Sequence, residues 1–327
     1  MCENSREVSR RAFKMASSSD KKLCEGLEHL RLADKCLKTS FFKWKPDLDG
    51  AADEYAKAAT AFKNAKALEQ AKESYIKAAE TQKAMNSPFH AAKSYEQAGL
   101  LCKENKEYDN AVKLMELAAL MFQEHGTPDT AALCLEKAAK MVEQVHPDKA
   151  IMLYKKACEV GECEDRPRQS AEAIGKAARL LVKENRFDEA IECLKKEIGY
   201  YAEVEGYAQI RKLVMGIILI HLHQEDFVAA DQFFRSALSF PEFGYSEEGG
   251  VLQDLLKAYD DGDDDAVRTT LSLPLFKYMD NSFSKLARDM KVPIGLGGGS
   301  GSKSPMGTNS SSGPAEDNED EFPDGLC

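Results

Sequence analysis

The hydrophobic positions of the chain recur with a period of twenty residues. The repeating unit reads as a small residue, mostly alanine, at positions 0, +7 and +8 and a large residue, often tyrosine, at position +4. These positions form one stripe of a 3.6-residue helix, whereas a strand would show alternation. Ten units follow one another, and their first residues are Ala51, Ala71, Ala91, Ala111, Ala131, Ala150, Ser170, Ala190, Ile210 and Ala230.

The spacers between the units predict short turns. Asp, Asn and Pro gather there, as in HGTPDT and VHPDK. Asp suits a helix cap and Pro suits the first helical turn, so each step predicts one helix of about 14 residues and a short turn. Consecutive helices then run antiparallel, with the large residue of one over the alanines of the next. Five 40-residue hairpins would stack into a solenoid.

The pattern changes at both ends of the repeats. A helix is predicted from Asp20 to Lys38, with Leu23, Leu27, Leu30 and Leu37 on one face. A short amphipathic segment contains Leu252, Leu255, Leu256 and Tyr259, and the strings AVRTTL and LFKYMDNSFSKLARDM predict two more helices. The small–large–small pattern resembles the second helix of a tetratricopeptide repeat (TPR), although that repeat has 34 residues.

The predicted fold is therefore all-α: a TPR-like solenoid of antiparallel helical hairpins, about 14 helices in all. We expect an N-terminal extension without a fold over residues 1–19 and the solenoid over 20–244. A small C-terminal helical bundle should occupy 245–293. Residues 294–327 are rich in Gly and Ser and then acidic, so a disordered acidic tail is predicted there.

Charge and composition exclude several classes of function. The 327 residues carry a net charge of -11, so the protein as a whole lacks the basic footprint of a nucleic-acid-binding protein. No run of 18 apolar residues predicts a membrane span. The nine cysteines are scattered without a CxxC pair, which indicates free thiols in a reducing cytosol rather than a zinc site.

No motif predicts catalysis or a cofactor. The sequence lacks a nucleophile elbow, a P-loop and a GxGxxG string. His221 and His223 are two residues apart and would point to different sides of a helix. The acidic run from Asp260 has Lys257 and Arg268 where a calcium loop requires acids. The chain is accordingly predicted not to be an enzyme, and no cofactor or metal is expected.

Lysine recurs at position +6 of six units, namely at Lys57, Lys77, Lys137, Lys156, Lys176 and Lys196. Alternate helices of a solenoid face opposite walls. Lys57, Lys137 and Lys176 should therefore share one wall, and the other three lysines should share the opposite one. Two interpretations stay open: a solvated rim beside the core, or a basic strip for an acidic partner.

The string TSFFKWKPD, residues 39–47, interrupts the helical pattern. Pro46 disfavours a helix at Lys45, so the stretch lies in or near a turn. Phe41 and Phe42 beside Lys43 and Lys45 suit a membrane interface, with rings among the headgroups and lysines on anionic lipid. The alternative is that the rings fold back onto the first hairpin.

Three strings carry a family resemblance: CEGLEHLRLADKCLKTSFFKWKPD, LPLFKYMDNSF and the acidic end that closes in GLC. Over about residues 15 to 327 the chain resembles the soluble NSF attachment protein family, most of all its gamma branch. The resemblance implies a non-enzymatic adaptor that lies along four-helix SNARE bundles, the syntaxin-type complexes. It would recruit the hexameric AAA+ ATPase NSF for SNARE disassembly in vesicle fusion and in transport between ER and Golgi. The implied location is cytoplasmic, with peripheral membrane contact and no nucleic-acid partner.

The resemblance also implies roles for individual residues. Phe41 and Phe42 match the family's hydrophobic membrane-contacting loop. Lys176 falls where a relative has a SNARE-facing base, and Lys137 and Lys57 are expected to join it on the same wall.

At the other end of the chain, Leu326 matches a penultimate leucine that engages the ATPase. Glu319, Asp320 and Glu321 would meet basic patches on the same partner. The alternative function is a generic TPR-like peptide-binding scaffold, which would need Lys, Arg and Asn converging on one hairpin pair. The lysines are instead spread over several helices, which favours a long ligand.

Overall fold

A computed structural model describes residues 18–39 and 44–292 of the chain. Within these ranges the fold comprises fifteen α-helices and one 3₁₀-helix, without a strand, which confirms the predicted all-α, TPR-like solenoid. The first helices are α2 (Ser18–Leu37), α3 (Leu48–Asn64), α4 (Leu68–Ala84), α5 (Pro88–Glu104), α6 (Tyr108–Glu124), α7 (Pro128–Val142), α8 (Pro147–Cys163) and α9 (Pro167–Lys183). They are followed by α10 (Phe187–Glu203), α11 (Tyr207–His223), α12 (Phe227–Ala237), η1 (Phe243–Tyr245), α13 (Glu247–Asp260), α14 (Asp264–Leu271), α15 (Pro274–Lys277) and α16 (Asn281–Arg288).

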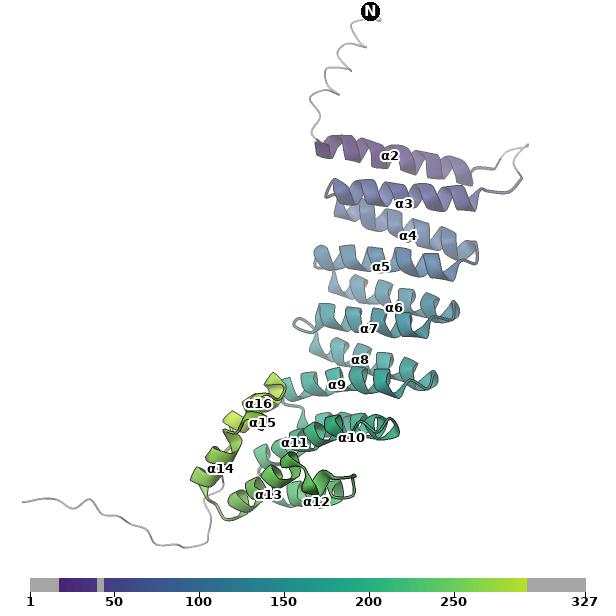
Figure 1. Cartoon of the computed structure of the whole chain (residues 1–327). Coiled ribbons are helices and arrows are strands. Elements are labelled where there is room, and N and C mark those ends of the chain that lie inside the picture. Colours follow the sequence, from purple (N-terminus) through teal and green to yellow (C-terminus); the bar gives the residue numbers. More distant parts are fainter. Residues whose placement is uncertain (1–17, 40–43, 293–327) are drawn as a thin grey trace, which may run out of the picture.

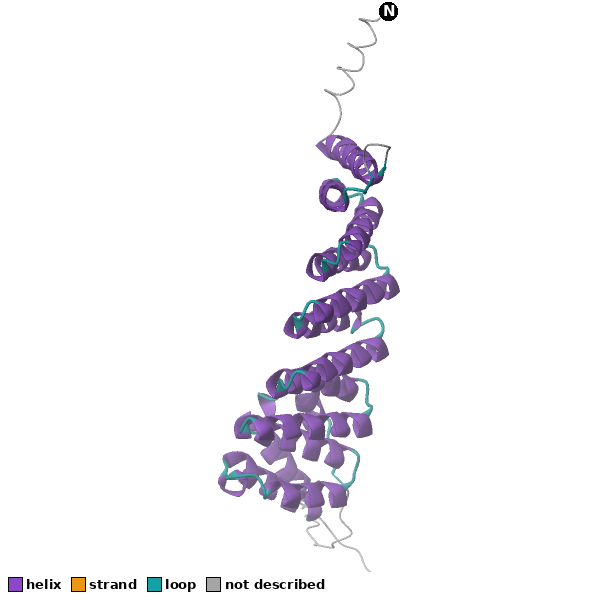
Figure 2. Cartoon of the chain, turned by 90° about the vertical axis from the view of Figure 1, so that its right-hand side faces the viewer, coloured by secondary structure: helices purple, strands orange, loops and turns teal. Residues whose placement is uncertain are grey.

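The helices form an elongated array, with α2 at one extremity and α12 to α16 gathered at the other (Figure 1). From α3 to α9, odd-numbered and even-numbered helices form two layers (Figures 1 and 2). From α2 to α10, each helix packs mainly against the helices before and after it in the chain, whereas α16 packs mainly against α11. None of the helices in the described ranges combines the length and the apolar run that a bilayer span requires.

The helices of the solenoid are longer than predicted: most have 17 residues rather than about 14. They reach this length because the turns between them are very tight. The N–H of Ala67 donates to the carbonyl of Phe62 at 2.9 Å, and the N–H of Lys66 donates to the carbonyl of Lys63 at 3.0 Å, which is a Schellman motif. The middle residue of most of the turns has a positive φ, at Lys66, Asn86, Lys106, Gly126, Asp165, Asn185, Glu205 and Glu225.

The predicted caps are correct only in part. Pro occupies the first turn of α5, α7, α8 and α9, as expected. The aspartates, however, cap only α3 and α12 within the solenoid, through Asp47 and Asp226. Asp109, Asp129 and Asp148 lie one position inside the first turn. There a carboxylate is favoured by the helix dipole without accepting a capping hydrogen bond.

The core consists of large side chains packed on alanines, as the pattern predicted. Alanines at positions 0, +7 and +8 are almost fully buried in most of the units, while Tyr55, Phe122 and Tyr154 are at most 4% exposed. The face predicted for α2 needs a correction, because Leu27 is 49% exposed. Gly26 and Ala33 are the buried residues of α2. A Cβ on Gly26 would lie 2.7 Å from the Phe62 ring, so glycine is required for this approach.

The C-terminal bundle contains the predicted amphipathic helix α13, with Leu252, Leu255, Leu256 and Tyr259 buried. After it the sequence predicted two helices, but three are present, because the second string is divided into α15 and α16. The bundle is attached to the solenoid at α11: the Tyr259 hydroxyl donates to the Leu222 carbonyl at 3.1 Å, and the Phe283 ring lies against Gly216.

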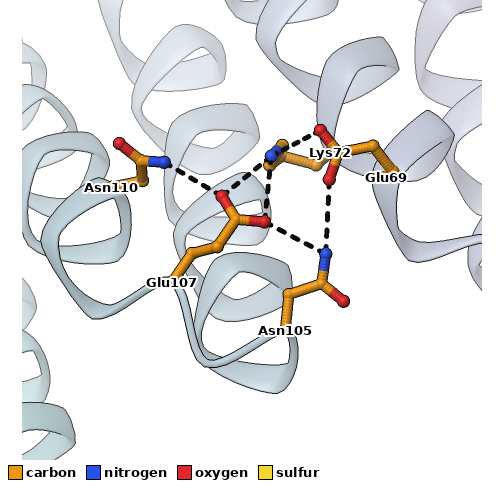
Figure 3. A network of polar contacts seen from close by, with 5 residues as sticks. All are labelled: Glu69, Lys72, Asn105, Glu107 and Asn110. Carbon is orange, nitrogen blue, oxygen red and sulfur yellow. Dashed lines mark hydrogen bonds and ion pairs between the residues drawn. The ribbon is translucent and has the colours of Figure 1, made fainter.

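Polar networks fix the ends of the hairpins. Lys72 of α4 bonds Glu69 at 2.6 Å and Glu107, at the start of α6, at 3.0 Å (Figure 3). Asn110 and Asn105 also donate to Glu107, at 2.9 Å and 3.1 Å. Hydrogen bonds from Asn110, Lys72 and Asn105 lower the pKa of Glu107 to about 2. The network holds the turn between α5 and α6 against α4.

Candidate partner-binding wall

Two walls of the solenoid face away from the core. On each helix, positions +2, +6, +9 and +13 lie opposite the buried stripe. The lysine wall is the outward face of α3, α5, α7 and α9, and it contains the predicted Lys57, Lys137 and Lys176. The opposite wall is the outward face of α4, α6, α8 and α10, and it contains Lys77, Lys156 and Lys196.

The lysines form ion pairs with helices two places earlier in the chain. Lys137 of α7 bonds Glu96 of α5 at 2.7 Å. Lys176 of α9 bonds Glu136 of α7, also at 2.7 Å. Because these pairs join helices of the same layer, they link successive hairpins along the wall.

Lys57, near the other end of the wall, has a partner in its own helix. It bonds Glu54 at 2.7 Å, and Glu54 also contacts His29 of α2 at 2.7 Å. The three lysines thus share a wall but not a site, since each is held by its own glutamate.

Ion pairing leaves the lysines available to a ligand. The side chains of Lys137 and Lys176 remain 57% and 41% exposed. An ammonium group has three donors, so one bond to a glutamate leaves donors for a partner. The lysines of this wall are therefore ion-paired and still partly exposed to solvent. This arrangement lies between the two interpretations, a solvated rim and a basic strip for an acidic partner.

The two walls differ in the residues around these pairs. The opposite wall has equivalent pairs, Lys156 with Glu116 and Lys196 with Glu162, both at 2.5 Å. It exposes three apolar side chains, Leu117, Leu120 and Met152, whereas the lysine wall exposes Leu133. The lysine wall carries further exposed or half-exposed bases, namely Lys93, Lys140, Arg179 and Lys183. These four bases occupy positions +2, +9 and +13, where the opposite wall has the exposed Lys113. A search at position +6 alone does not find them.

Glu96 is the most deeply buried carboxylate of these pairs on the lysine wall. Burial acts to raise the pKa of Glu96, but Lys137 and Lys93 outweigh it and hold the pKa below its ordinary value. Glu96 is therefore ionised near neutral pH and keeps both lysines on the wall.

The lysine wall ends in a cavity of about 660 Å³ between α9 and α16. Lys176, Arg179 and Lys183 of α9 line one side, and Lys285 of α16 lies on the other. Through Lys285, the C-terminal bundle thereby extends the lysine wall beyond α9.

A buried carboxylate lies behind this cavity. Glu197 of α10 is 1% exposed, and its Oε1 accepts a hydrogen bond from Arg179 at 3.3 Å. Its Oε2 has no hydrogen-bond partner among the described residues. Arg179 also faces Asp280, the N-cap of α16, at 3.6 Å. Burial raises the pKa of Glu197 to about 7, although Arg179 acts to lower it.

Sequence reasoning missed Glu197, yet the repeat contained a signal for it. Glu197 occupies position +7 of its unit, where most of the other units have a small residue. Gly175 of α9 makes room for the carboxylate, because a Cβ there would lie 2.5 Å from Glu197 Oε1. Because the alanine stripe is buried, a charged residue on it predicts a buried ion pair.

The predicted membrane loop lies between α2 and α3. Its base is closed by the N–H of Asp47, which donates to the carbonyl of Cys36 at 3.1 Å. Lys45 is exposed and Trp44 is 86% exposed, so Trp44 is not buried against the first hairpin. Phe41, Phe42 and Lys43 lie outside the described residues.

The predicted ATPase-engaging residues, Glu319, Asp320, Glu321 and Leu326, also lie outside the described residues. In the part of the chain that the structure describes, no group of three or more His, Cys, Asp or Glu side chains is placed to hold a metal ion.

Comparison with known proteins identifies related chains. A family model described as soluble NSF attachment protein, SNAP, matches residues 24–282. A gamma-soluble NSF attachment protein of Dictyostelium discoideum is 32% identical over 274 residues, which cover 84% of each chain. One of Arabidopsis thaliana is 28% identical over 155 residues, covering 47% of this chain and 52% of that one. A solved structure of a signal-transduction ATPase with a tetratricopeptide repeat sensor, from Pyrococcus horikoshii, aligns with a TM-score of 0.40 and 16% sequence identity. The alignment covers 88% of this chain and 46% of that one.

The buried Glu197 generates a prediction about pH. An acid whose pKa is higher in the folded than in the unfolded state adds stability below its unfolded value, and this stability is lost as the pH rises through its folded value. The parent should therefore lose stability between about pH 4.5 and about pH 7, whereas Glu197→Gln should not. We expect the free energy of unfolding of the variant, relative to that of the parent, to rise by roughly 1–3 kcal/mol over this range and to remain constant at higher pH.

Urea unfolding at pH 5, 6, 7 and 8 would measure this difference. Glu192→Gln is the matched control, because Glu192 is an exposed residue of the same helix. Parallel pH profiles for the parent and Glu197→Gln would show that Glu197 does not titrate in this range.

Proposed function

Because the chain belongs to the soluble NSF attachment protein family, we propose that it is a non-enzymatic adaptor that binds SNARE four-helix bundles and recruits the ATPase NSF for their disassembly. The ligands would be syntaxin-type complexes, and the ATPase would act as a hexamer. The processes served are vesicle fusion and intracellular transport, including transport between ER and Golgi. The protein would act in the cytoplasm, peripherally associated with membranes.

The observation that supports this proposal is the lysine wall. Lys137 and Lys176 lie on successive helices of one layer, each exposed and each held by a glutamate from the helix before it in that layer. A row of this kind suits a long acidic rod better than a short peptide, which needs donors converging on one point. Charge pairing across such a surface gives specificity and rapid association while permitting release.

The proposed membrane contact is the loop between α2 and α3. The hydrogen bond between Asp47 and Cys36 closes the base of this loop at one extremity of the array. Phe41 and Phe42 would enter the headgroup layer, with Lys43 and Lys45 beside anionic lipid. Each buried ring contributes about 1.5–3 kcal/mol and each lysine about 1 kcal/mol before losses, so the contact would be reversible.

The proposed ATPase contact is the acidic end of the chain. Leu326 would insert into the partner, and Glu319, Asp320 and Glu321 would face its basic surface. This end follows the C-terminal bundle in the sequence, and the bundle lies at the extremity of the array opposite to α2. The adaptor would thus bind membrane, SNARE bundle and ATPase at three separate places.

The SNARE contact is tested by reversing charge on one wall at a time. We expect Lys137→Glu with Lys176→Glu to weaken binding to a purified SNARE bundle by about tenfold or more. Lys156→Glu with Lys196→Glu is the control, because it breaks the same number of lysine–glutamate pairs on the opposite wall. Equal losses from both double variants, in pull-down or calorimetry, would rule out a wall-specific site.

The membrane contact is tested with vesicles. We expect Phe41→Ser with Phe42→Ser to reduce co-flotation with anionic liposomes by about tenfold or more, because two buried rings are lost. Helicity measured by circular dichroism should not change. Leu117→Ser with Leu120→Ser removes a comparable exposed apolar pair from the opposite wall and should bind as the parent does. Unchanged flotation of the double-Phe variant would exclude a membrane role for the loop.

The ATPase contact is tested by disassembly kinetics. We expect Leu326→Ala to slow ATP-driven disassembly of the SNARE bundle, because the apolar anchor is lost, while SNARE binding stays at the parent level. Met306→Ala, which also shortens an apolar side chain after residue 293, is the control. A disassembly rate equal to that of the parent would remove Leu326 from the ATPase interface.

A further inference from the structure

An apolar groove of about 450 Å³ lies between α14 and α16 in the C-terminal bundle. Val267, Phe276, Ala287 and Met290 form its floor, and each is at most 6% exposed. Leu271 and Val292 are half-buried on its sides. All of the residues that line the groove belong to the C-terminal bundle and the segment that follows it, between Val267 and Val292.

The rim of the groove is basic. Arg268, Lys277 and Arg288 line it together with Ser272 and Ser284, and no carboxylate is among the lining residues in the described ranges. Arg268 pairs with Asp264 at 2.6 Å and Arg288 pairs with Asp289 at 3.0 Å, and neither of these acids lines the groove. An apolar floor with a cationic rim matches a segment that combines an apolar side chain with flanking acids.

The chain itself contains such a segment directly after the groove. Val292, which lines the groove, is the last described residue, and the sequence continues to Cys327. Residues 316–326 place the apolar Phe322 and Leu326 among six acids, Glu316, Asp317, Glu319, Asp320, Glu321 and Asp324. No basic residue lies among them.

We propose that residues 316–326 dock in this groove of their own chain, with Phe322 on the apolar floor and the acids along the rim of Arg268, Lys277 and Arg288. Chain length permits the return, because the roughly 30 residues between Val292 and Phe322 span ~100 Å when fully extended. A tethered segment is present at an effective concentration of about millimolar, so even a weak contact is well populated.

The consequence rests on the proposed function. Leu326 and the acids before it are the residues that would engage the ATPase. While they lie in the groove, that engagement is withheld, and a partner that takes the segment must first displace it. The docked segment would then act as an autoinhibitory contact. Docking of the segment in the groove does not itself require the ATPase, so it can be tested without it.

Disulfide trapping on the full chain tests the docking without any partner. The terminal Cys327 is the reporter, in a background where Cys2, Cys24, Cys36 and Cys163 are changed to serine. Ser272→Cys places a thiol on the groove rim, and Lys285→Cys places one on the same bundle beside the other cavity, as the matched control. Mild oxidation, electrophoresis and peptide mapping give the rate of each intramolecular disulfide.

We expect the disulfide from Ser272→Cys to form about fivefold faster or more than the one from Lys285→Cys, and Phe322→Ser with Leu326→Ser to abolish this preference. A smaller preference, or one that survives the tail substitutions, would overturn the proposal. Linked dimers in place of linked monomers would assign the groove to a second copy and overturn it as well. None of these results depends on SNARE binding or disassembly, so the proposed function stands or falls separately.

Discussion

The alanines of each unit set the distance between neighbouring helices, and the rest of the architecture depends on that distance. Alanine at positions 0, +7 and +8 brings one helix close to the next, and a large side chain at +4 fills the remaining space. Because nearly the same contact recurs along the solenoid, the array is regular. A three-residue turn can join only helices that are this close, so packing and turns specify the same spacing.

Regular spacing also determines where charges meet. A lysine at +6 of one helix reaches a glutamate of the helix two places earlier, on both walls, at 2.5–2.7 Å. Exposed pairs of this kind contribute little stability. Under the proposed function, an acidic ligand would use the donors that Lys137 and Lys176 keep beside their bonds to Glu96 and Glu136. Each such contact would be weak, and the contacts would add up along the wall, which suits a ligand that has to be released.

Much of this fold could be predicted because its information is local and periodic. The ten units, their order and their buried stripe follow from the spacing of alanine and tyrosine. The exact helix ends could not be predicted, because Lys66, Glu205 and Glu225 adopt a left-handed turn that usually favours glycine. The exposure of Leu27 depends on which side of α2 meets Phe62, and that is a tertiary contact. The lysines could be assigned to a wall, but their glutamate partners lie about 40 residues away and follow only from the three-dimensional register.

A charged residue stands on the alanine stripe where the solenoid meets the C-terminal bundle. Glu197 stands at a position where most of the other units have alanine, and its Oε2 has no hydrogen-bond partner among the described residues. Buried ion pairs are weak sources of stability, and the attested reason to retain one is the choice of a particular arrangement. Here Gly175 admits the carboxylate, the carboxylate orients Arg179, and Arg179 faces the cap of α16. The contacts of the bundle with α11 hold it on the solenoid, and this chain of polar contacts adds a directional constraint that favours one register of α16 on α9. This register determines the position of the cavity between α9 and α16, where the lysine wall ends. It also determines the position of Val292, after which the sequence continues to its acidic end.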